Sequence, residues 1–285
     1  MQKQELMRAA ALMKHGCVYE ETGGVGFFRA EALKNTPGVE HGFTARTGGV
    51  TPAPYDSLHL NCKKPHGDVE LVKENFRRFG LACGVEYASM AVINYEHGNR
   101  VLRVNSANRG QGIEFAPLPP CDGLITDDPD ITLLTNHADC GAFFLYDPVK
   151  RAVGIAHAGW KGTLGRIGGR MVEKMAGEFG SNPRDLIAST GPCICQDCYE
   201  VEQELADRFE REFGQGTCAV PGRAGHAQLS IELAAAVQLL EAGVRAEHIT
   251  LMEKCTYEDP ARLFSHRRDK NGTGDMAGYI KLTKK

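Results

Sequence analysis

Two apolar runs on either side of a short turn constrain the fold of this chain more than any other feature. The runs span residues 141–146 and 151–156, and Asp147-Pro148 lies in the turn between them. Asp-Pro favours a turn, so we predict an antiparallel β-hairpin. Cys140 and His157 are equally far from the centre of this turn, which would set their Cβ atoms opposite each other, about 4.5–5.5 Å apart. A thiolate and an imidazole placed in this way can hold one metal ion, or they can form a Cys/His dyad.

A third candidate ligand is His97, which follows a strand-like run at residues 90–93. Two histidines and one cysteine that lie far apart in the sequence are typical of a catalytic zinc site, in which the fourth position stays open. The alternative is structural. A buried cysteine often packs as a small apolar side chain, and a histidine at a strand end often serves only as a hydrogen-bonding group.

Composition narrows the class of ligand. The chain has 285 residues, a formal net charge of −3 and no long basic run, which argues against a nucleic-acid or anionic-membrane partner and favours a small molecule. No apolar run approaches the ~18 residues of a membrane helix, and charged residues interrupt residues 1–16, so we expect no signal peptide and a cytoplasmic location. The ten cysteines are accordingly expected to be reduced thiols.

The chain shows no internal repeat or linker, and we predict a single domain over residues 1–285. Apolar stripes predict helices at residues 68–79, 162–179, 201–213 and 231–242, the last with a Ser230 cap. Strands are predicted at residues 25–30, 90–94, 124–126, 131–135, 141–146, 151–157, 186–190 and 249–254. Strands and helices do not alternate strictly, and one neighbouring pair is a hairpin. This order favours an α+β fold with mixed sheets in layers.

Several short motifs resemble one known family. In chain order they read FTARTGGV (43–50), HG (97–98), DGLIT (122–126), NHADC (136–140), AHAGWKG (156–162), GP (191–192), YEV (199–201) and KCT (254–256). Together they resemble the YfiH/LACC1 family, whose members have been called laccase-domain proteins, polyphenol oxidases and purine nucleoside phosphorylases. The resemblance covers about residues 39–280, and its most specific parts are the ADC and HAGWKG motifs.

The resemblance implies a layered α/β/β/α sandwich, preceded by an N-terminal extension at residues 1–20. It also implies one zinc ion, with copper as the other option, held by His97 of the HG motif, Cys140 of the ADC motif and His157 of the HAGW motif. The implied activities are phosphorolysis of adenosine, inosine and methylthioadenosine, and hydrolytic deamination of adenosine. The implied ligands are therefore a purine nucleoside and phosphate. The oligomeric state stays open, with a homodimer as one option.

Physical chemistry suggests how such reactions would proceed. Deamination needs an activated water, and a zinc ion with three protein ligands lowers the pKa of its bound water to about 7. Phosphorolysis needs an anion site, and Arg46 followed by Gly48-Gly49 offers a guanidinium beside exposed backbone N–H groups. A helix that begins near Gly162 would add a positive N-terminal end close to His157. Arg46 can alternatively form a surface salt bridge.

Four further residues are candidates for the site. Asp139 and Asp122 are each expected to carry a proton or to orient a histidine ligand. Cys255 and Arg267 match positions of the family motifs, although the sequence does not define their roles.

The chain departs from the family at two positions. Asp275 replaces a family arginine, which puts an anion where a phosphate-binding cation is expected. His137 replaces a usual threonine, and it can be an extra ligand, a proton shuttle or a loop residue; we expect a loop residue.

Three alternatives compete with the nucleoside enzyme. A copper-dependent polyphenol oxidase of the multicopper type needs His-x-His pairs, which this sequence lacks. A cysteine hydrolase would use Cys140 and His157 as nucleophile and base, on an amide such as those in peptidoglycan precursors. A zinc-stabilised binding protein would use the metal only to hold its fold.

A separate cluster of thiols invites a second metal site. It comprises Cys193, Cys195 and Cys198, with Cys218 as a conceivable fourth ligand, although reduced thiols in a turn are the preferred interpretation.

Overall fold

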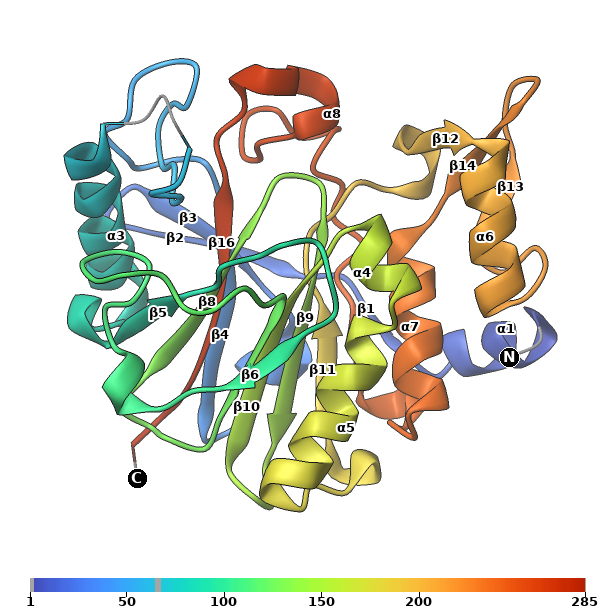
Figure 1. Ribbon diagram of the computed structural model, residues 1–285, viewed down its shortest axis with the longest axis horizontal. Coiled ribbons are helices and arrows are strands. Elements are labelled where there is room, and N and C mark those ends of the chain that lie inside the picture. The colour runs from blue at the N-terminus through green and yellow to red at the C-terminus, as the bar shows by residue number, and fades with distance from the viewer. Residues whose placement is uncertain (1–2, 65–67, 285) are drawn as a thin grey trace.

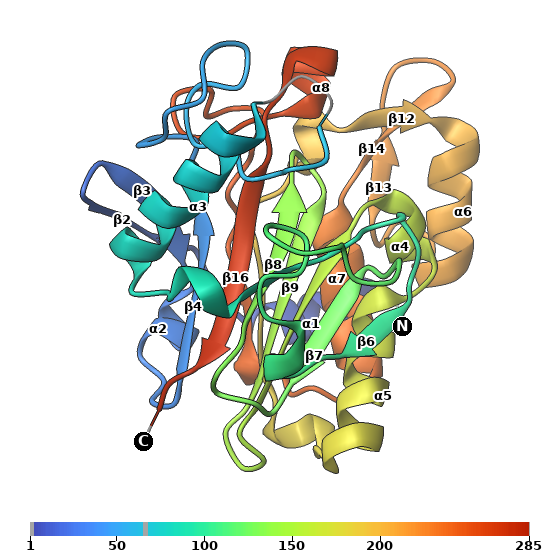
Figure 2. The ribbon, with the colours of Figure 1, turned by 60° about the vertical axis from the view of Figure 1, so that its left-hand side comes forward.

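The structure is a computed structural model that describes residues 3–64 and 68–284 (Figure 1). Two large β-sheets pack face to face, and helices cover their outer faces (Figures 1 and 2). One outer layer is α3 (Val69–Cys83), and the other is formed by α5 (Ile167–Phe179) and α7 (Ile231–Glu241). Separate apolar clusters fill the space between the sheets and the space beneath each helical layer. This arrangement confirms the predicted α+β fold with an α/β/β/α order of layers.

The first large sheet has seven strands and contains the hairpin. In spatial order the strands are β1 (Lys14–His15), β15 (Ile249–Leu251), β11 (Ile187–Thr190), β9 (Gly141–Asp147), β10 (Ala152–Ala158), β7 (Gly123–Thr126) and β6 (Val101–Arg103). Parallel and antiparallel pairs are mixed, as the sequence order predicts. Strands β9 and β10 are buried along their whole length, because one face contacts the second sheet and the other contacts the helices.

The register of the hairpin differs from the prediction by two residues. His157 pairs with Ala142 and Ala158 pairs with Gly141, so the expected pairing of Cys140 with His157 is wrong. Side chains alternate between the faces of a strand with a period of two, and a shift of two residues therefore leaves each side chain on its original face. Cys140, just before β9, consequently still lies on the same side as His157.

The turn itself explains this shift. The loop has four residues, 148–151, and it closes with Arg151 in the left-handed region at φ 53°. The Asp147 carboxylate accepts hydrogen bonds from the backbone N–H groups of Val149 and Lys150 at 2.8 and 2.9 Å. The aspartate thus organises a longer loop than the two-residue turn that the symmetric prediction assumes.

The second large sheet has six strands, three of which the sequence analysis does not identify. In spatial order they are β2 (Val18–Thr22), β3 (Val25–Arg29), β4 (Val39–Thr44), β16 (Met276–Leu282), β8 (Thr132–His137) and β5 (Met90–Val92). Strands β2, β4 and β16 are the unpredicted ones. Strand β16, from the C-terminal end of the chain, lies between β4 and β8, and its pairing depends on contacts between residues far apart in sequence.

The predicted helices form, with different ends. Helix α3 is capped by Asp68, whose side chain accepts from the Glu70 N–H, and Ser230 caps α7 by accepting from the Leu233 N–H. The predicted helix at residues 162–179 is two helices, α4 (Trp160–Leu164) and α5, because Arg166 adopts a left-handed conformation at φ 59°.

The remaining helices are shorter or peripheral. They are α1 (Lys3–Ala10), α2 (Glu31–Lys34), α6 (Gln203–Phe213) and α8 (His266–Asp269), with 3-10 turns at Tyr87–Ser89, Ser106–Asn108, Pro183–Asp185, Gln196–Cys198, Ala246–His248 and Lys270–Gly272. Among residues 3–64 and 68–284, none of the helices has the length and apolar character that crossing a membrane requires.

A small sheet and α6 form a unit beside α4 and α7 (Figures 1 and 2). Its strands are β12 (Glu200–Glu202), β14 (His226–Leu229) and β13 (Ala219–Pro221), and a separate apolar cluster packs them against α6 and α7. The described part of residues 1–20 packs on the same body: Leu6 and Met13 are buried, and β1 is the edge strand of the seven-stranded sheet.

Acid is expected to destabilise the fold through His41 on β4. Its Nε2 accepts from the Ala30 N–H at 3.0 Å, and burial, followed by the charge of Arg29, lowers the pKa of His41 to about 3. In the unfolded chain a histidine titrates near 6.5. As the pH falls from about 6.5 towards 3, the unfolded state gains a proton that the folded state cannot accept, so stability falls by about 1.4 kcal/mol per pH unit.

We therefore expect this one side chain to lower the free energy of unfolding by about 2 kcal/mol between pH 7 and pH 5. Urea unfolding of the wild type and of His41→Phe at both pH values measures the effect. The variant should be about 1–3 kcal/mol less stable at pH 7, because the Ala30 N–H loses its acceptor, yet it should lose less stability in acid. An equal loss in both proteins would show that His41 does not cause it.

Candidate metal centre and its cavity

Three donor side chains predicted as metal ligands converge at one end of the large sheets. His97, Cys140 and His157 each offer a ligand atom, and these three atoms lie within 4.8 Å of one another. They come from three places: the loop after β5, the residue before β9 and the C-terminal end of β10. Zn–N bonds of about 2.0–2.1 Å and Zn–S bonds of about 2.3 Å are compatible with these separations. The donor set therefore fits one tetrahedral metal ion that keeps a position open.

Asp122 holds two of these ligands in place. Its carboxylate is fully buried and accepts from the backbone N–H groups of Glu96, His97 and Gly98 at 3.3, 3.0 and 2.7 Å. It also lies 3.2 Å from His157 Nδ1. Burial opposes ionisation, but the hydrogen bonds from His157 and the backbone keep the pKa of Asp122 below its ordinary value. Asp122 is thus a positioning residue: it fixes the His97 loop, and it turns His157 so that Nε2 is left for a metal.

Replacing Asp122 by asparagine is expected to weaken metal binding. The amide NH2 cannot accept a hydrogen bond, so at least one N–H of the His97 loop or His157 Nδ1 loses its acceptor. We expect the zinc affinity to fall by about 10–100-fold. Competition with a chromophoric chelator measures it. Asp147→Asn is the matched control, because Asp147 is an equally buried carboxylate that accepts two backbone N–H groups in the remote hairpin loop. Equal zinc affinity in Asp122→Asn and the control would contradict the role.

Asp139 holds the cysteine ligand from the other side. It adopts a left-handed conformation at φ 86°, which is uncommon for a residue with a side chain. Its Oδ1 accepts from Thr256 Oγ1 and its Oδ2 accepts from the Arg267 N–H, both at 2.6 Å. Since each carboxylate oxygen already has a donor, Asp139 fixes the turn that presents Cys140, and it ties this turn to α8.

The electrostatics of the donor set favour a positive charge on His157. Burial lowers the pKa of His157, but the Cys140 thiolate and the hydrogen bond to Asp122 outweigh it and raise the pKa to about 9. For His97, burial and the neighbouring His157 lower the pKa, so its imidazole is neutral and can donate its lone pair. The surroundings of His157 thus form an environment that stabilises a positive charge.

Close packing explains the two glycines of the HAGWKG motif, Gly159 and Gly162. A Cβ atom at Gly159 would lie 3.1 Å from Cys140 Sγ, 3.4 Å from His97 Cδ2 and 3.7 Å from His157 Cε1, so a glycine there leaves room beside all three ligands. At Gly162 a Cβ atom would lie only 2.7 Å from the Gly98 carbonyl oxygen. The two glycines therefore allow the segment to pass close to the metal ligands and the His97 loop.

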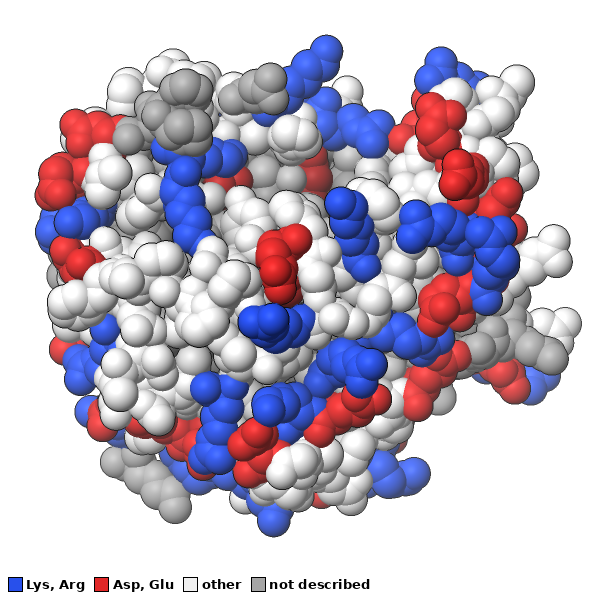
Figure 3. Space-filling model, in the orientation of Figure 1, with Lys and Arg blue, Asp and Glu red and all other residues white. Residues whose placement is uncertain are grey.

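Beside the donor set lies a cavity of about 370 Å³, a volume within the range of small-molecule sites. Figure 3 shows that the surface is hollowed between α8 and the unit of β12–β14 and α6. The cavity lining comprises two of the three donors, aromatic and apolar side chains, and cationic side chains: His97, Ala138, Asp139, Cys140, Gly159, Trp160, Lys161, Ile194, Tyr199, Ile231, His266 and Arg267.

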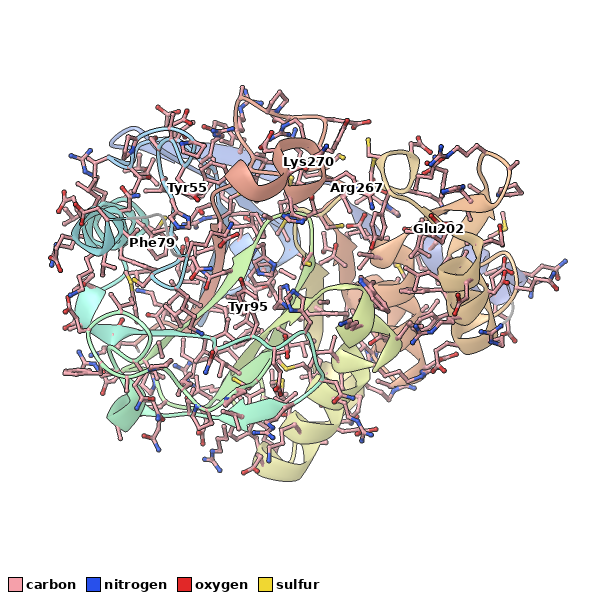
Figure 4. The ribbon with its side chains drawn as sticks, turned by 45° about the horizontal axis from the view of Figure 1, so that its top comes forward. Tyr55, Phe79, Tyr95, Glu202, Arg267 and Lys270 are labelled. Atoms are coloured by element: carbon pink, nitrogen blue, oxygen red, sulfur yellow. The ribbon has the colours of Figure 1, made fainter. Side chains whose placement is uncertain are left out.

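The cations of the cavity come from α4 and α8. Lys161 follows Trp160, with Nζ 5.4 Å from the centre of the indole ring. The guanidinium of Arg267 lies 5.1 Å from the Tyr199 ring, and its Nη1 donates to the Glu200 carbonyl at 2.9 Å. Figure 4 shows Arg267 between α8 and the part of the molecule that carries Glu202. Sequence reasoning overlooked Lys161 and Trp160 as site residues, although their place in the HAGWKG motif was a usable signal.

Arg46 is not brought to this cavity. Its Nε donates to the Asp56 carbonyl at 2.8 Å, its Nη1 donates to the Pro260 carbonyl at 3.2 Å, and the guanidinium stacks over Phe264. The neighbouring glycines are needed for packing, since a Cβ atom at Gly49 would lie 2.0 Å from the Ser57 carbonyl oxygen. Residues 46–49 thus form a structural junction outside the cavity, and Arg46 Nη2 pairs with Asp56 Oδ1 at 3.2 Å, in agreement with the alternative of a salt bridge. The helix expected from Gly162 also begins earlier, at Trp160.

The two departures from the family pattern have structural explanations. His137 is not a loop residue, because it ends β8 and is buried behind His157, with ring centres 5.5 Å apart. Its Nδ1 lies 3.1 Å from the Cys140 carbonyl, and its Nε2 lies 2.7 Å from Thr135 Oγ1, so both nitrogens are occupied.

Asp275 is also buried, and neighbouring groups compensate its negative charge. Its Oδ1 lies 2.9 Å from Lys64 Nζ and its Oδ2 accepts from Asn61 Nδ2 at 2.6 Å. It does not line the cavity.

Cys255 belongs to a second group of donors, with Cys195, Cys198 and Glu258, whose ligand atoms also lie within 4.8 Å of one another. Of the thiols considered in the sequence, Cys195 and Cys198 belong to this group and Cys193 and Cys218 do not; Cys218 is buried in the cluster beneath α6. All ten cysteines have free thiols.

The fold and the site together define a class of protein: a layered α+β protein whose two sheets bring a His2Cys donor set together beside a cavity. The chain belongs to the family described as multi-copper polyphenol oxidoreductase laccase, whose model matches residues 40–283. This confirms the family resemblance found in the sequence motifs. Among the residues that the structure describes, however, only one group of converging donors contains histidine, so the donors of a trinuclear copper cluster do not come together.

Relatives and solved structures agree with this membership. Purine nucleoside phosphorylase YlmD from Bacillus subtilis (strain 168) is 34% identical over 255 residues, which are 88% of this chain and 91% of that protein. A purine nucleoside phosphorylase from Deinococcus radiodurans is 36% identical over 247 residues, or 87% of this chain and 90% of that protein. The crystal structure of YlmD from Geobacillus stearothermophilus has a TM-score of 0.87 at 30% identity and covers 94% of this chain and 100% of that chain.

Proposed function

We propose that this protein is a zinc-dependent purine nucleoside enzyme. Its reactions would be phosphorolysis of adenosine, inosine and methylthioadenosine, and hydrolytic deamination of adenosine. The observation that carries the proposal is the convergence of His97, Cys140 and His157 beside a cavity that also offers an aromatic surface and cations. The names of the relatives, which are purine nucleoside phosphorylases, support the substrate class.

His97, Cys140 and His157 would hold the zinc ion. One thiolate and two imidazoles suit zinc, and their arrangement leaves one side open to the cavity. When bound, zinc supplies a Lewis acid that activates water near neutral pH. The task of the protein is then to keep the three donors rigid, which Asp122 and Asp139 do through their hydrogen bonds.

A purine base would bind against the aromatic and apolar side of the cavity. Trp160 and Tyr199 offer ring surfaces for stacking, and the buried side chains of Ile194 and Ile231 complete this side. Burial, together with the charge of Cys140, raises the pKa of Tyr199 to about 12. Its hydroxyl is therefore protonated at neutral pH and can donate a hydrogen bond to a ring nitrogen of the base.

Phosphate would bind to the cations of α4 and α8. Lys161 and Arg267 line the same cavity, and the only carboxylate in its described lining, that of Asp139, already accepts two hydrogen bonds. In phosphorolysis a phosphate oxygen bonds to the ribose C1′ while the purine leaves with the electrons of the glycosidic bond. The cations orient the phosphate for this attack and reduce the repulsion between anion and enzyme.

Incubation of the purified protein with adenosine, with and without phosphate, tests the proposal. Chromatography should show adenine when phosphate is present and inosine when water alone is available. Because Trp160 is the single tryptophan of the chain, quenching of its fluorescence should report nucleoside binding in the same samples. If neither product forms at high enzyme concentration while zinc is bound, the proposed function is wrong.

A cysteine hydrolase is the second candidate, because the Cys140 sulfur and a ring nitrogen of His157 lie within 4.8 Å of each other. The charge of Cys140 contributes most to raising the pKa of His157, and a thiol beside an imidazole is the nucleophile and base that such enzymes use. A zinc-bound thiolate alkylates slowly, whereas a catalytic one alkylates fast. Less than half an equivalent of zinc, together with rapid modification of Cys140 by iodoacetamide, would favour the hydrolase.

We further infer a cytoplasmic location. The ten free thiols support it, since thiols stay reduced in that compartment. Cell fractionation with an antibody against the chain would test this.

A further inference from the structure

We propose a second, structural zinc site formed by Cys195, Cys198, Cys255 and Glu258. It goes beyond the proposed function, because it shares no ligand with the His97, Cys140 and His157 set. The four ligand atoms, three sulfurs and one carboxylate oxygen, lie within 4.8 Å of one another. These separations are compatible with tetrahedral zinc, whose Zn–S bonds are about 2.3 Å long. Soft thiolates also select zinc over magnesium or calcium.

The spacing of the ligands resembles that of structural zinc sites. Cys195 and Cys198 form a C-x2-C pair, and Cys255 and Glu258 form a matching C-x2-E pair from a distant part of the chain. Two such pairs, each on a tight turn, hold a metal ion between two loops. Cys195 begins the first turn as the N-cap of the 3-10 helix Gln196–Cys198.

Backbone contacts bring the two pairs together. Cys193 and Cys255 form a parallel β-bridge, in which the Cys193 N–H donates to the Lys254 carbonyl and the Thr256 N–H donates to the Cys193 carbonyl, both at 3.1 Å. The turns that follow this bridge then face each other. The ligand positions are thus set by the fold itself, which lowers the entropy lost when a metal binds.

The sulfurs have the surroundings that metal-bound thiolates need. The backbone N–H of Cys195 donates to Cys255 Sγ at 3.4 Å, a contact that offsets the negative charge of a thiolate. Cys198 Sγ lies 3.6 Å from Glu258 Oε1, so the carboxylate already faces the sulfurs. Cys255 is buried and Glu258 is exposed, which gives the cluster a closed base and an open side for metal entry.

A metal at this position would brace the wall of the cavity. The segment of Cys195 and Cys198 leads directly into Tyr199, and Thr256, next to Cys255, donates to Asp139 beside Cys140. Arg268 of α8 donates to the carbonyls of Thr256 and Tyr257 at 2.9 Å. The second zinc would therefore join two loops and, through them, keep α8 and Tyr199 in position.

Cobalt binding to the Cys140→Ser protein tests the site directly. In this variant the first donor set has lost its thiolate, so absorption from thiolate-to-cobalt charge transfer can arise only from a second thiolate site. We expect this absorption to appear on titration with Co²⁺ and to vanish in Cys140→Ser/Cys198→Ser. Cys140→Ser/Cys62→Ser is the matched control, since Cys62 is also half-buried but belongs to neither donor group. The cobalt absorption of this double variant should equal that of Cys140→Ser.

Zinc content of the full-length protein provides the second measurement. The wild type should bind one zinc equivalent per chain more than Cys198→Ser does, while Cys62→Ser should match the wild type. Glu258→Gln keeps the shape of the exposed ligand and serves as a second variant if Cys198→Ser fails to fold. It should lower the affinity of the second site for zinc by about 10-fold or more.

Two results would overturn the proposal. One is the absence of thiolate-to-cobalt absorption in Cys140→Ser, and the other is a disulfide between Cys195 and Cys198 in protein purified without oxidant. Neither measurement uses nucleoside turnover, so failure of the second site and failure of the proposed function can be told apart.

Discussion

Replacing Cys140 by serine is expected to abolish both nucleoside activities, with a loss of about 1,000-fold or more in kcat/KM for adenosine. This loss corresponds to about 4 kcal/mol of transition-state stabilisation. The serine hydroxyl stays protonated at neutral pH, so the donor set loses its negative ligand and the attraction that raises the pKa of His157. Product formation by chromatography and zinc content per chain should fall together.

The fold of this variant should be retained. Cys140 is half-buried and precedes β9, so its replacement leaves no large cavity in the core. Circular dichroism and urea unfolding check this point, and Cys62→Ser serves as the control for loss of a half-buried thiol. If Cys140→Ser kept more than a tenth of the wild-type rate, the metal site could not be the reaction centre. If it unfolded, the zinc-stabilised binding protein would become the better hypothesis.

Removing the cations of the cavity is expected to separate the two reactions. In Lys161→Gln/Arg267→Gln, the KM for phosphate in phosphorolysis should rise by about 10-fold or more, because each charge-assisted hydrogen bond contributes about 1.5–3 kcal/mol. Deamination of adenosine uses water, and its rate should change much less. Initial rates with varied phosphate and with varied adenosine give the two results side by side.

The control for this experiment is Lys174→Gln on the exposed side of α5, where Lys174 pairs with Glu178 at 2.7 Å. It removes one positive charge without touching the cavity. An unchanged KM for phosphate in the double variant would show that phosphate binds elsewhere. A parallel loss of both reactions would instead indicate that Arg267 acts by holding Tyr199 and Glu200 in place.

The three converging donors could be predicted from the sequence because their signals are local. His97 stands before a glycine, Cys140 precedes an apolar strand, and His157 ends the next strand, and all three lie in specific motifs. Even the wrong hairpin register did not separate Cys140 from His157, since a two-residue shift preserves the face of a strand. Alternation along strands is thus a more robust guide to a site than the pairing of particular residues.

The surroundings of the ligands were harder to predict. Arg46 has the chemistry of a phosphate ligand, yet the carbonyls of Asp56 and Pro260 occupy its guanidinium. The sequence leaves Asp122 either to carry a proton or to orient a histidine, and only its contacts with three backbone N–H groups and His157 favour the second role. Which donor meets which acceptor depends on loops that are far apart in the chain.

The sequence by itself determined the class of fold, most helices and strands, and the three donor side chains that converge, because propensity, periodicity and motif spacing act over a few residues. Only the tertiary structure decided the central position of β16, the hairpin register and the partnership of Cys255 with Cys195 and Cys198. These features arise from contacts between residues that are separated by tens to hundreds of positions. Such contacts are selected by the packing and hydrogen bonding of the whole molecule, which no local pattern encodes.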